Sequence, residues 1–302
     1  MLTFRLDSSA RLAVMRPSAI IFAALALVSG PVLAAAEPVQ IKPSLLRLNG
    51  NLELPAGEKL EGENVVLIVH GMLSHYGQET IAALQKNLKA RGLASLAINL
   101  SLGIDDRKGP RPCDVVHDYA LAGARREIRL WVEWLAAQHA KSIDIIGFSR
   151  GGAQVAAIGS ELPTIRRMVL LAPAFATAAE QAAEYERAFG HPLAPELDAA
   201  RKQPLQKYTV DFLTCRQATV LGATLLDAYT EMPTKLAART GHPTLVIVAG
   251  KDTQVPDLAA KLPSEVKPVV VDGASHFFPD LYGEEAADVI AKFLKADQPA
   301  TK

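Results

Sequence analysis

The sequence predicts an α/β fold in which a mainly parallel, doubly wound sheet is covered by helices on both faces. Solid apolar runs of the kind expected for buried strands recur along the chain, as at Asn64–Val69 and Thr244–Ala249. Segments with apolar residues at helical spacing lie between such runs. One run, Ile143–Ile146, continues into the small-residue turn Gly147–Gly152, where a strand and a helix can cross closely. Strands that alternate with helices in this way favour parallel pairing.

The composition is that of a compact globular protein. The 302 residues are 49% hydrophobic, which is enough for one large core or two modest ones. Lys and Arg total 32 and equal the 32 Asp and Glu, so no basic excess favours a nucleic-acid partner. No segment after the N-terminal region is apolar enough to span a membrane. The oligomeric state is left open.

The N-terminal region has the features of an export signal. Arg16 precedes a short apolar stretch, and the triplet Ala34–Ala36 supplies small residues at a cleavage site. We therefore expect residues 1–36 to be removed and residues 37–302 to form an exported protein, periplasmic or secreted. Two alternatives remain open, an uncleaved membrane anchor and a translation start at Met15.

The first part of the domain predicts three strand regions and a helix. An antiparallel hairpin at one sheet edge is expected for Val39–Leu54, because leucines alternate around the pair Asn49-Gly50. Asn64–Val69 is expected to be a strand buried on both faces. Gln78–Arg91 has apolar residues at spacings of three and four and predicts an amphipathic helix. Leu93–Leu100 predicts the next buried strand.

The middle of the chain predicts a long helix and then the strand–turn–helix unit. Val115–Ala140 carries apolar residues on one helical face, with Trp131 expected in the core and Asp114 as the N-cap. The small-residue turn is followed by a predicted helix at Arg150–Ser160 and a predicted strand at Met168–Leu171.

The alternation of strands and helices stops between residues 175 and 240. This segment is rich in alanine and predicts a helical cap, inserted over the ends of the strands. After it, Thr244–Ala249 and Pro268–Val271 predict two more strands, and Glu284–Lys295 predicts a closing helix.

The chain contains two cysteines, Cys113 and Cys215. In an exported protein such a pair forms a disulfide more often than it remains as two free thiols. The bridge would close a loop of about 100 residues and stabilise the fold by about 4 kcal/mol in the chain-entropy model. We predict this disulfide, with two free thiols as the alternative.

The turn Gly147–Gly152 predicts a nucleophile at Ser149. Its glycines remove the Cβ atoms that would collide there, and the N-terminus of the next helix favours negative charge beside the hydroxyl. A serine needs a base and an orienting acid. His276 follows the last predicted strand and is the candidate base. Asp252 follows the strand before it and is the candidate acid.

Donors for the oxyanion of such a reaction are expected at two backbone N–H groups. The first is the N–H of Met72, which lies in the loop after the first central strand. The second is the N–H of Arg150, the residue after the nucleophile. The Arg150 side chain is expected to pack or to pair with a local carboxylate, rather than to bind an acidic substrate group. His75 and Tyr76 either line the mouth of the pocket or belong to a solvated loop.

An acidic cluster that extends from the loop after the second central strand into the start of the long helix could suggest a metal site. It contains Asp105, Asp106, Asp114, His117 and Asp118. The spacing matches no closed set of metal ligands, and residues of these types commonly cap helices. We therefore expect no metal site.

Four short elements together resemble the α/β-hydrolase superfamily. They are His70-Gly71, Gly147–Gly152, Gly250–Asp252 and Ser275-His276. The resemblance extends over about Leu46–Lys295, and several segments are similar to a group of exported bacterial hydrolases.

The resemblance implies an α/β-hydrolase fold and acyl-transfer chemistry on esters, thioesters or amides, without a cofactor. It also implies a catalytic triad of Ser149, Asp252 and His276. The leading hypothesis is an exported serine hydrolase that cleaves a carboxylic ester in a small-molecule substrate. A peptidase or thioesterase would use the same groups, and a non-catalytic binding or scaffold protein on the same fold is the alternative from another class.

Overall fold

The computed structural model describes residues 36–43 and 45–296. Nearly all of the expected export signal, residues 1–36, and the alternative start at Met15 lie outside the described residues, so both stay predictions. Among the helices in the described ranges, none is both long and apolar enough to cross a membrane.

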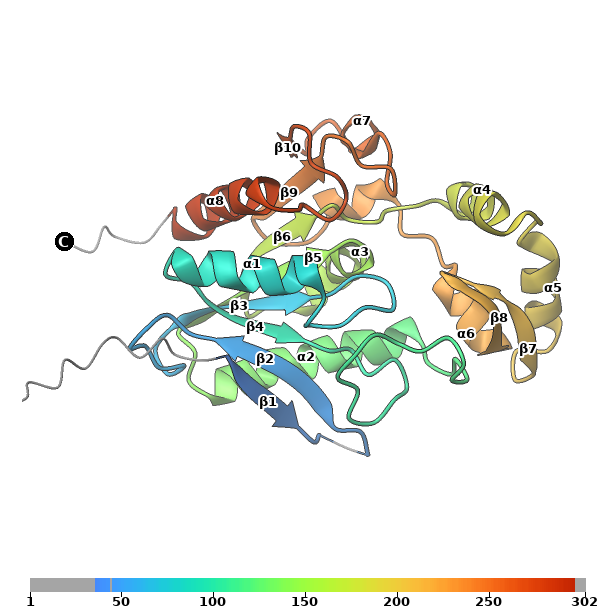
Figure 1. Cartoon of the computed structure of the whole chain (residues 1–302), viewed down its shortest axis with the longest axis horizontal. Coiled ribbons are helices and arrows are strands. Elements are labelled where there is room, and N and C mark those ends of the chain that lie inside the picture. Colours follow the sequence, from blue (N-terminus) through green and yellow to red (C-terminus); the bar gives the residue numbers. More distant parts are fainter. Residues whose placement is uncertain (1–35, 44, 297–302) are drawn as a thin grey trace, which may run out of the picture. The chain divides into compact units, whose positions relative to one another are not determined.

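A sheet of eight strands forms the centre of the described domain (Figure 1). Its strands are β1 (Glu37–Ile41), β2 (Leu48–Glu53), β3 (Asn64–Val69), β4 (Ala94–Ile98), β5 (Ser142–Phe148), β6 (Ile165–Leu171), β9 (Thr244–Ala249) and β10 (Val269–Val271). They lie in the order β1-β2-β4-β3-β5-β6-β9-β10. The six strands from β4 to β10 in this order pair in parallel, whereas β1 and β2 are antiparallel. The predicted mainly parallel sheet is confirmed.

Helices cover both faces of this sheet, as Figure 1 shows. Their bounds are α1 (Glu79–Ala90), α2 (Leu121–Ala137), α3 (Arg150–Ile158), α7 (Leu258–Lys261) and α8 (Leu281–Lys295), and a short 3-10 helix, η1, spans Gly159–Glu161. One apolar cluster joins α1 and α8 to the sheet, and the other joins α2 and α3 to its opposite face.

Strand β3 shows why its sequence is apolar at nearly every position. Val65, Leu67 and Val69 pack in the cluster with α2 and α3. Val66 and Ile68 pack in the cluster with α1 and α8. Because successive side chains of a strand point to opposite faces, both faces must be apolar when both are covered.

The insertion of residues 175–240 contains helices and also a β-hairpin. Its elements are α4 (Ala178–Phe189), α5 (Ala194–Lys202), β7 (Lys207–Phe212), β8 (Cys215–Leu221), α6 (Gly222–Ala228) and the 3-10 helix η2 (Thr234–Ala238). The purely helical expectation therefore missed the antiparallel pair β7–β8. Val210, Phe212 and Val220 pack in a small apolar cluster that also includes Leu73 of the loop after β3, and this packing stabilises the hairpin.

The edge hairpin exists, but its turn lies elsewhere than expected. Residues 42–47 connect β1 to β2, and Asn49-Gly50 lies inside β2. A Cβ atom at Gly50 would come within 3.0 Å of the Leu96 side chain and 3.3 Å of the Trp131 ring. The glycine therefore serves close packing here, and Trp131 is fully buried, as predicted.

Helix α2 starts at Leu121, so the predicted start at Val115 and the predicted N-cap at Asp114 were wrong. The preceding segment pairs with the insertion instead. The His117 N–H donates to the Thr219 carbonyl at 2.8 Å, and the His117 carbonyl accepts from the Leu221 N–H at 2.9 Å. These bonds attach the segment to β8 at His117, where the two form an isolated parallel bridge.

The predicted disulfide is confirmed. Cys113 and Cys215 are bonded, with their Cα atoms 5.4 Å apart and 102 positions apart in sequence. The bridge joins the segment before α2 to the start of β8, so it connects the central domain to the insertion.

Candidate active site

Ser149 lies in a strained turn between β5 and α3. Its φ of 53° and ψ of −122° fall outside the regions that residues with a side chain usually adopt. The turn is possible because a glycine follows: a Cβ atom on Gly151 would lie 2.4 Å from the backbone oxygen of His70. This tight crossing exposes the Ser149 side chain at the carboxyl end of the sheet.

Three predicted side chains meet at this end of the sheet. The Ser149 Oγ lies 2.9 Å from Nε2 of His276, and Nδ1 of His276 lies 2.7 Å from Oδ2 of Asp252. Ser149 follows β5 directly, and Asp252 and His276 follow β9 and β10. The His276 ring can therefore accept the serine hydrogen at Nε2 while its Nδ1–H donates to the carboxylate.

The Asp252 carboxylate is held in its ionised form. Burial alone would raise its pKa, but the hydrogen bond from His276 and those from two backbone N–H groups outweigh burial, so the pKa is lowered. Oδ1 accepts from the N–H of Gln254 at 2.8 Å and from that of Val255 at 2.9 Å. These bonds fix the carboxylate in place beside the imidazole.

Two aromatic rings enclose the His276 ring. Phe148 and Phe277 each have their ring centre 5.2 Å from it, and His276 is only 5% exposed. Phe277 itself is half exposed, and its carbonyl accepts a hydrogen bond from the Thr80 hydroxyl at 2.9 Å. Phe277 was not predicted to contact the site, although it directly follows the candidate base in the sequence.

The candidate oxyanion donors belong to segments that adjoin the nucleophile. Met72 lies in the loop after β3, and Arg150 is the first residue of α3. A Cβ atom on Gly71 would lie 3.2 Å from Cβ of Ser149, so this loop packs directly against the serine. The predicted role of the two N–H groups stays a prediction.

A cavity of about 370 Å³ adjoins these two residues. Its lining includes Met72, Arg150, Phe175, Tyr185, Phe189 and Tyr229. The hydroxyl groups of its two tyrosines are already engaged: Tyr185 donates to the Asp211 carbonyl, and Tyr229 accepts from the Leu213 N–H, both at 3.1 Å. Burial raises the pKa of Tyr185 and raises that of Tyr229 to about 12, so both rings are neutral. Phe175, Phe189 and the two tyrosine rings therefore give the cavity an apolar part, while charged side chains also line it: Glu180, Glu184, Arg187 and Lys261.

Arg150 connects the nucleophile turn to the insertion. Its guanidinium donates to the carbonyl of Ala228, the last residue of α6, at 2.7 Å. The side chain therefore packs, as expected, but its hydrogen-bond partner is a carbonyl oxygen and not a carboxylate. His75 and Tyr76 are not among the residues that line the cavity.

The acidic residues after β4 form ion pairs. Asp105 bonds to Arg47 at 2.7 Å, and the Arg47 side chain lowers the pKa of Asp105 to about 2. Asp106 lies 3.6 Å from the Lys108 ammonium. Within the described ranges, no group of three or more His, Cys, Asp or Glu side chains is placed to hold a metal ion.

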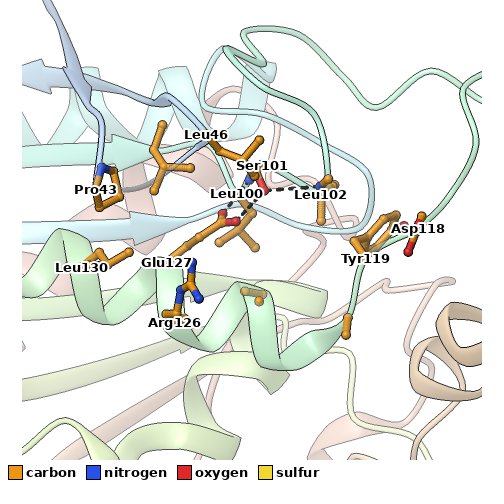
Figure 2. A pocket seen from close by; sticks show the side chains of 15 residues that line it. Pro43, Leu46, Leu100, Ser101, Leu102, Asp118, Tyr119, Arg126, Glu127 and Leu130 are labelled. Carbon is orange, nitrogen blue, oxygen red and sulfur yellow. Dashed lines mark hydrogen bonds between the residues drawn. The ribbon is translucent and has the colours of Figure 1, made fainter.

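A second cavity, of about 250 Å³, lies between α2 and the segment after β4 (Figure 2). In it the Glu127 carboxylate accepts hydrogen bonds from the Ser101 N–H at 2.6 Å and from the Ser101 hydroxyl. Neither cavity is lined by Ser149, Asp252 or His276 themselves, but the larger one is lined by Arg150, which follows the serine, and by Gln254 and Val255, whose N–H groups bind Asp252. The larger cavity is therefore the candidate substrate pocket.

The fold and the site define a class of protein. A parallel sheet that brings a serine, an aspartate and a histidine together at its carboxyl end, in that chain order, is the arrangement of the α/β hydrolases. A sequence profile described as the alpha/beta hydrolase family matches residues 66–292. The chain belongs to this family, which supports a hydrolytic function. No curated protein matches the chain in sequence.

Solved structures share this fold over most of the chain. Est1E from Butyrivibrio proteoclasticus with bound ferulic acid has a TM-score of 0.64 at 20% identity, covering 85% of this chain and 98% of that one. The monoacylglycerol lipase of Paleococcus ferrophilus has a TM-score of 0.55 at 20% identity, with 82% and 98% covered. The esterase domain of a Rhodothermus marinus protein has a TM-score of 0.54 at 17% identity, with 87% and 97% covered.

Proposed function

We propose that this protein is a serine hydrolase that cleaves a carboxylic ester through an acyl-enzyme. The observation that carries the proposal is the unbroken line of hydrogen bonds from Ser149 through His276 to Asp252 at the carboxyl end of the sheet. A serine hydroxyl beside a neutral imidazole, itself oriented by a carboxylate, is the arrangement that makes serine a nucleophile at neutral pH.

In the first half of the reaction, Nε2 of His276 takes the hydroxyl proton as the Ser149 oxygen bonds to the ester carbonyl carbon. The carbonyl oxygen becomes negatively charged and accepts hydrogen bonds from the N–H groups of Met72 and Arg150. The bond to the alcohol oxygen then breaks, and His276 gives its proton to the departing alcohol. Asp252 orients the imidazole and stabilises the imidazolium.

In the second half, a water molecule replaces the alcohol. His276 takes a proton from this water as its oxygen bonds to the acyl carbon. When the tetrahedral intermediate collapses, the bond to Ser149 breaks and the proton returns to the serine oxygen. The free carboxylic acid leaves, and the enzyme regains its starting state.

The larger cavity favours an uncharged ester with an apolar group of moderate size. Its volume of about 370 Å³ lies at the small end of the roughly 300–1,000 Å³ that pockets for small molecules span. Its aromatic wall favours burial of an apolar acyl or alcohol group. Several similar structures are named as esterases or lipases, which favours an ester over a thioester or an amide.

Export to the periplasm or beyond the cell is part of the proposal. The disulfide between Cys113 and Cys215 is consistent with an oxidising compartment, and the N-terminal signal features point the same way. N-terminal sequencing of the exported protein is expected to find a start near Ala35 or Glu37; a start before Ala19 would contradict cleavage.

Labelling with a fluorophosphonate tests the function directly, because this reagent reacts only with an activated serine. The mature wild-type protein is expected to be labelled and to hydrolyse p-nitrophenyl esters, and Ser149→Ala is expected to lose both properties. A panel of esters, thioesters and peptides of graded chain length then defines the substrate. Absence of labelling in the folded wild-type protein would favour the non-catalytic binding protein.

A further inference from the structure

The loop of residues 70–74, which follows β3, carries the Met72 N–H that the proposed function uses as an oxyanion donor. The loop packs on the nucleophile, since a Cβ atom on Gly71 would lie 3.2 Å from Cβ of Ser149. It contains a residue in the left-handed region, Leu73, with φ of 49°. A donor must lie within hydrogen-bond distance of the developing oxyanion, so small displacements of this loop are expected to slow the reaction.

A buried arginine fixes both ends of this loop. Arg107 is 5% exposed, and its NH1 group donates to the carbonyl of Ser74 at 2.7 Å and to that of Gly109. Its NH2 group lies 3.0 Å from Nε2 of His70. Its Nε donates to the Leu100 carbonyl at 2.8 Å, which connects the loop to the segment that follows β4. The planar guanidinium, with five donors in a fixed fork, reaches all these acceptors at once.

The His70 ring completes this connection. Its Nε2 also accepts from the N–H of Leu100 at 3.2 Å, so the ring carries its proton on Nδ1, which donates to the Gly71 carbonyl at 2.8 Å. Burial, and then the nearby Arg107 cation, lowers the pKa of His70 to about 3. The ring is therefore neutral, and Arg107 favours the tautomer that holds the carbonyl next to Met72.

A contribution to the stability of the fold does not by itself explain why a charged guanidinium is buried at position 107. In the described part of the chain, the hydrogen-bond partners of the Arg107 guanidinium are carbonyl oxygens and the His70 ring, and it forms no ion pair. Burial lowers the pKa of Arg107 to about 10, and the Glu127 charge partly offsets this effect. A buried charge without a bonded counter-ion destabilises a fold relative to a packed apolar side chain.

The same segment is anchored from its other side. Figure 2 shows Glu127 of α2 hydrogen-bonded to Ser101, the residue next to the carbonyl of Leu100 that Arg107 holds. Asn99 adds two bonds: its amide donates to the Arg107 carbonyl at 2.8 Å and its oxygen accepts from the Tyr76 N–H at 2.6 Å. The backbone of Arg107 is therefore fixed by Asn99, while its side chain binds the loop of residues 70–74.

We propose that Arg107 is a positioning residue of the hydrolysis reaction, whose buried guanidinium holds the loop of residues 70–74 so that the Met72 N–H faces the developing oxyanion. The inference rests on the proposed function and deepens it. Arg107 touches neither the substrate carbonyl nor Ser149; it acts through the loop. Its effect is therefore on the transition state, where the oxyanion exists, and little on binding of the neutral ester.

The test compares Arg107→Met and Arg107→Lys with the wild-type protein on one p-nitrophenyl ester. Loss of a well-placed oxyanion donor lowers kcat by about 10²-fold, so Arg107→Met is expected to show a loss of this order with KM changed less than about threefold. Arg107→Lys is expected to lose less, because its ammonium keeps the charge and up to three of the hydrogen bonds. Phenylboronic acid, which forms a tetrahedral adduct with serine, should bind more weakly by the same factor as kcat/KM falls.

Leu135→Ala is the matched control, since Leu135 is fully buried in the core cluster with α2 and lies outside this network. It is expected to lower the melting temperature while kcat and phenylboronic acid affinity stay at wild-type values. Three outcomes would overturn the inference and leave the proposed function standing. They are a wild-type kcat in folded Arg107→Met, an equal loss of kcat in Leu135→Ala, and failure of both Arg107 variants to fold. A folded wild-type protein that neither hydrolyses esters nor reacts with fluorophosphonate would overturn the proposed function, and the inference with it.

Discussion

At the residue scale, each of the three central side chains is placed by a different strand. Ser149 is held by the turn after β5, Asp252 by two backbone N–H groups after β9, and His276 by the two aromatic rings around it. The backbone position of each residue is therefore set by its own strand and loop, and the hydrogen bonds between the side chains then orient them. Single substitutions should therefore leave the fold intact, which makes the following kinetic comparison possible.

If the three side chains act as one relay, their losses are not additive. Ser149→Ala and His276→Ala should each lower kcat by about 10⁶-fold, and Asp252→Asn by about 10⁴-fold because the base remains. The double variant of Ser149 and His276 should be no slower than either single variant. The measurement is kcat/KM on one activated ester; losses that simply multiply would show that the residues act independently.

The lowered pKa of Asp252 predicts how acid affects stability. The folded carboxyl has a lower pKa than the unfolded one, at about 3.9, so it stabilises the fold above about pH 4, and this contribution is lost as pH falls through the folded pKa. Asp252→Asn lacks this contribution. Its deficit in the free energy of unfolding should be largest at pH 7 and should narrow below pH 4. Urea unfolding at several pH values measures the deficit, and one that stays constant with pH would contradict the assignment.

At the scale of elements, the crossing of β3, β5 and α3 sets the geometry of the site. Helix α3 approaches the end of β3 so closely that a Cβ atom on Gly151 would meet the backbone oxygens of His70 and Val69 at 2.4 and 2.6 Å. Backbone oxygens within a central sheet cannot move aside easily. The same contact therefore couples the nucleophile turn to the loop of residues 70–74.

The coupling between the nucleophile turn and the loop of residues 70–74 can be tested by substituting a glycine at the crossing and, for comparison, a glycine of α2 that lies away from it. Gly151→Ala should destabilise the fold by about 1–3 kcal/mol and lower kcat, because either α3 or the loop after β3 must shift. Gly123→Ala is the control: it lies in the first turn of α2, where an added Cβ atom would have no neighbour within 4 Å, and should stabilise by about 0.5–1 kcal/mol. Thermal unfolding and ester hydrolysis measure both effects, and equal behaviour of the two variants would refute the argument.

At the scale of the whole described domain, the sequence predicted the sheet well because its physical signal is local. A run such as Asn64–Val69 is apolar throughout because alternate residues face two separate clusters. The three site residues were predictable for a related reason: each follows such a run, and the carboxyl ends of parallel strands meet at one edge of the sheet.

What the sequence did not reveal depends on contacts between distant segments. The segment before Leu121 looks helical on its own but pairs with β8, a strand about 100 residues further along the chain. The β7–β8 hairpin itself lies within an alanine-rich, mainly helical insertion. Arg107 lies in a polar loop with glycine and proline, which suggests solvent exposure. In the structure it is buried, and its guanidinium donates to carbonyl groups at three separate positions. Tertiary structure overrides local preference at each of these places.

At the same scale, the disulfide joins the insertion to the central domain. Removal of the disulfide is expected to destabilise mainly the insertion. The chain-entropy model gives a stabilisation of about 4 kcal/mol for a closed loop of about 100 residues, and removal of native disulfides commonly costs about 2–5 kcal/mol. Replacing both Cys113 and Cys215 by alanine should therefore lower the melting temperature by about 10 °C.

The position of the bridge also predicts which contacts loosen first. Cys215 starts β8, which is bridged to His117, and the insertion supplies Tyr185 and Tyr229 to the larger cavity. In the cysteine-free variant, amide hydrogens of β7 and β8 should exchange faster while those of β3 and β5 stay protected. Because the cavity wall loosens whereas the hydrogen-bonded line from Ser149 to Asp252 stays in the central domain, KM should rise more than kcat falls. Uniformly faster exchange, or a loss confined to kcat, would mean that the bridge stabilises the central domain and not the insertion.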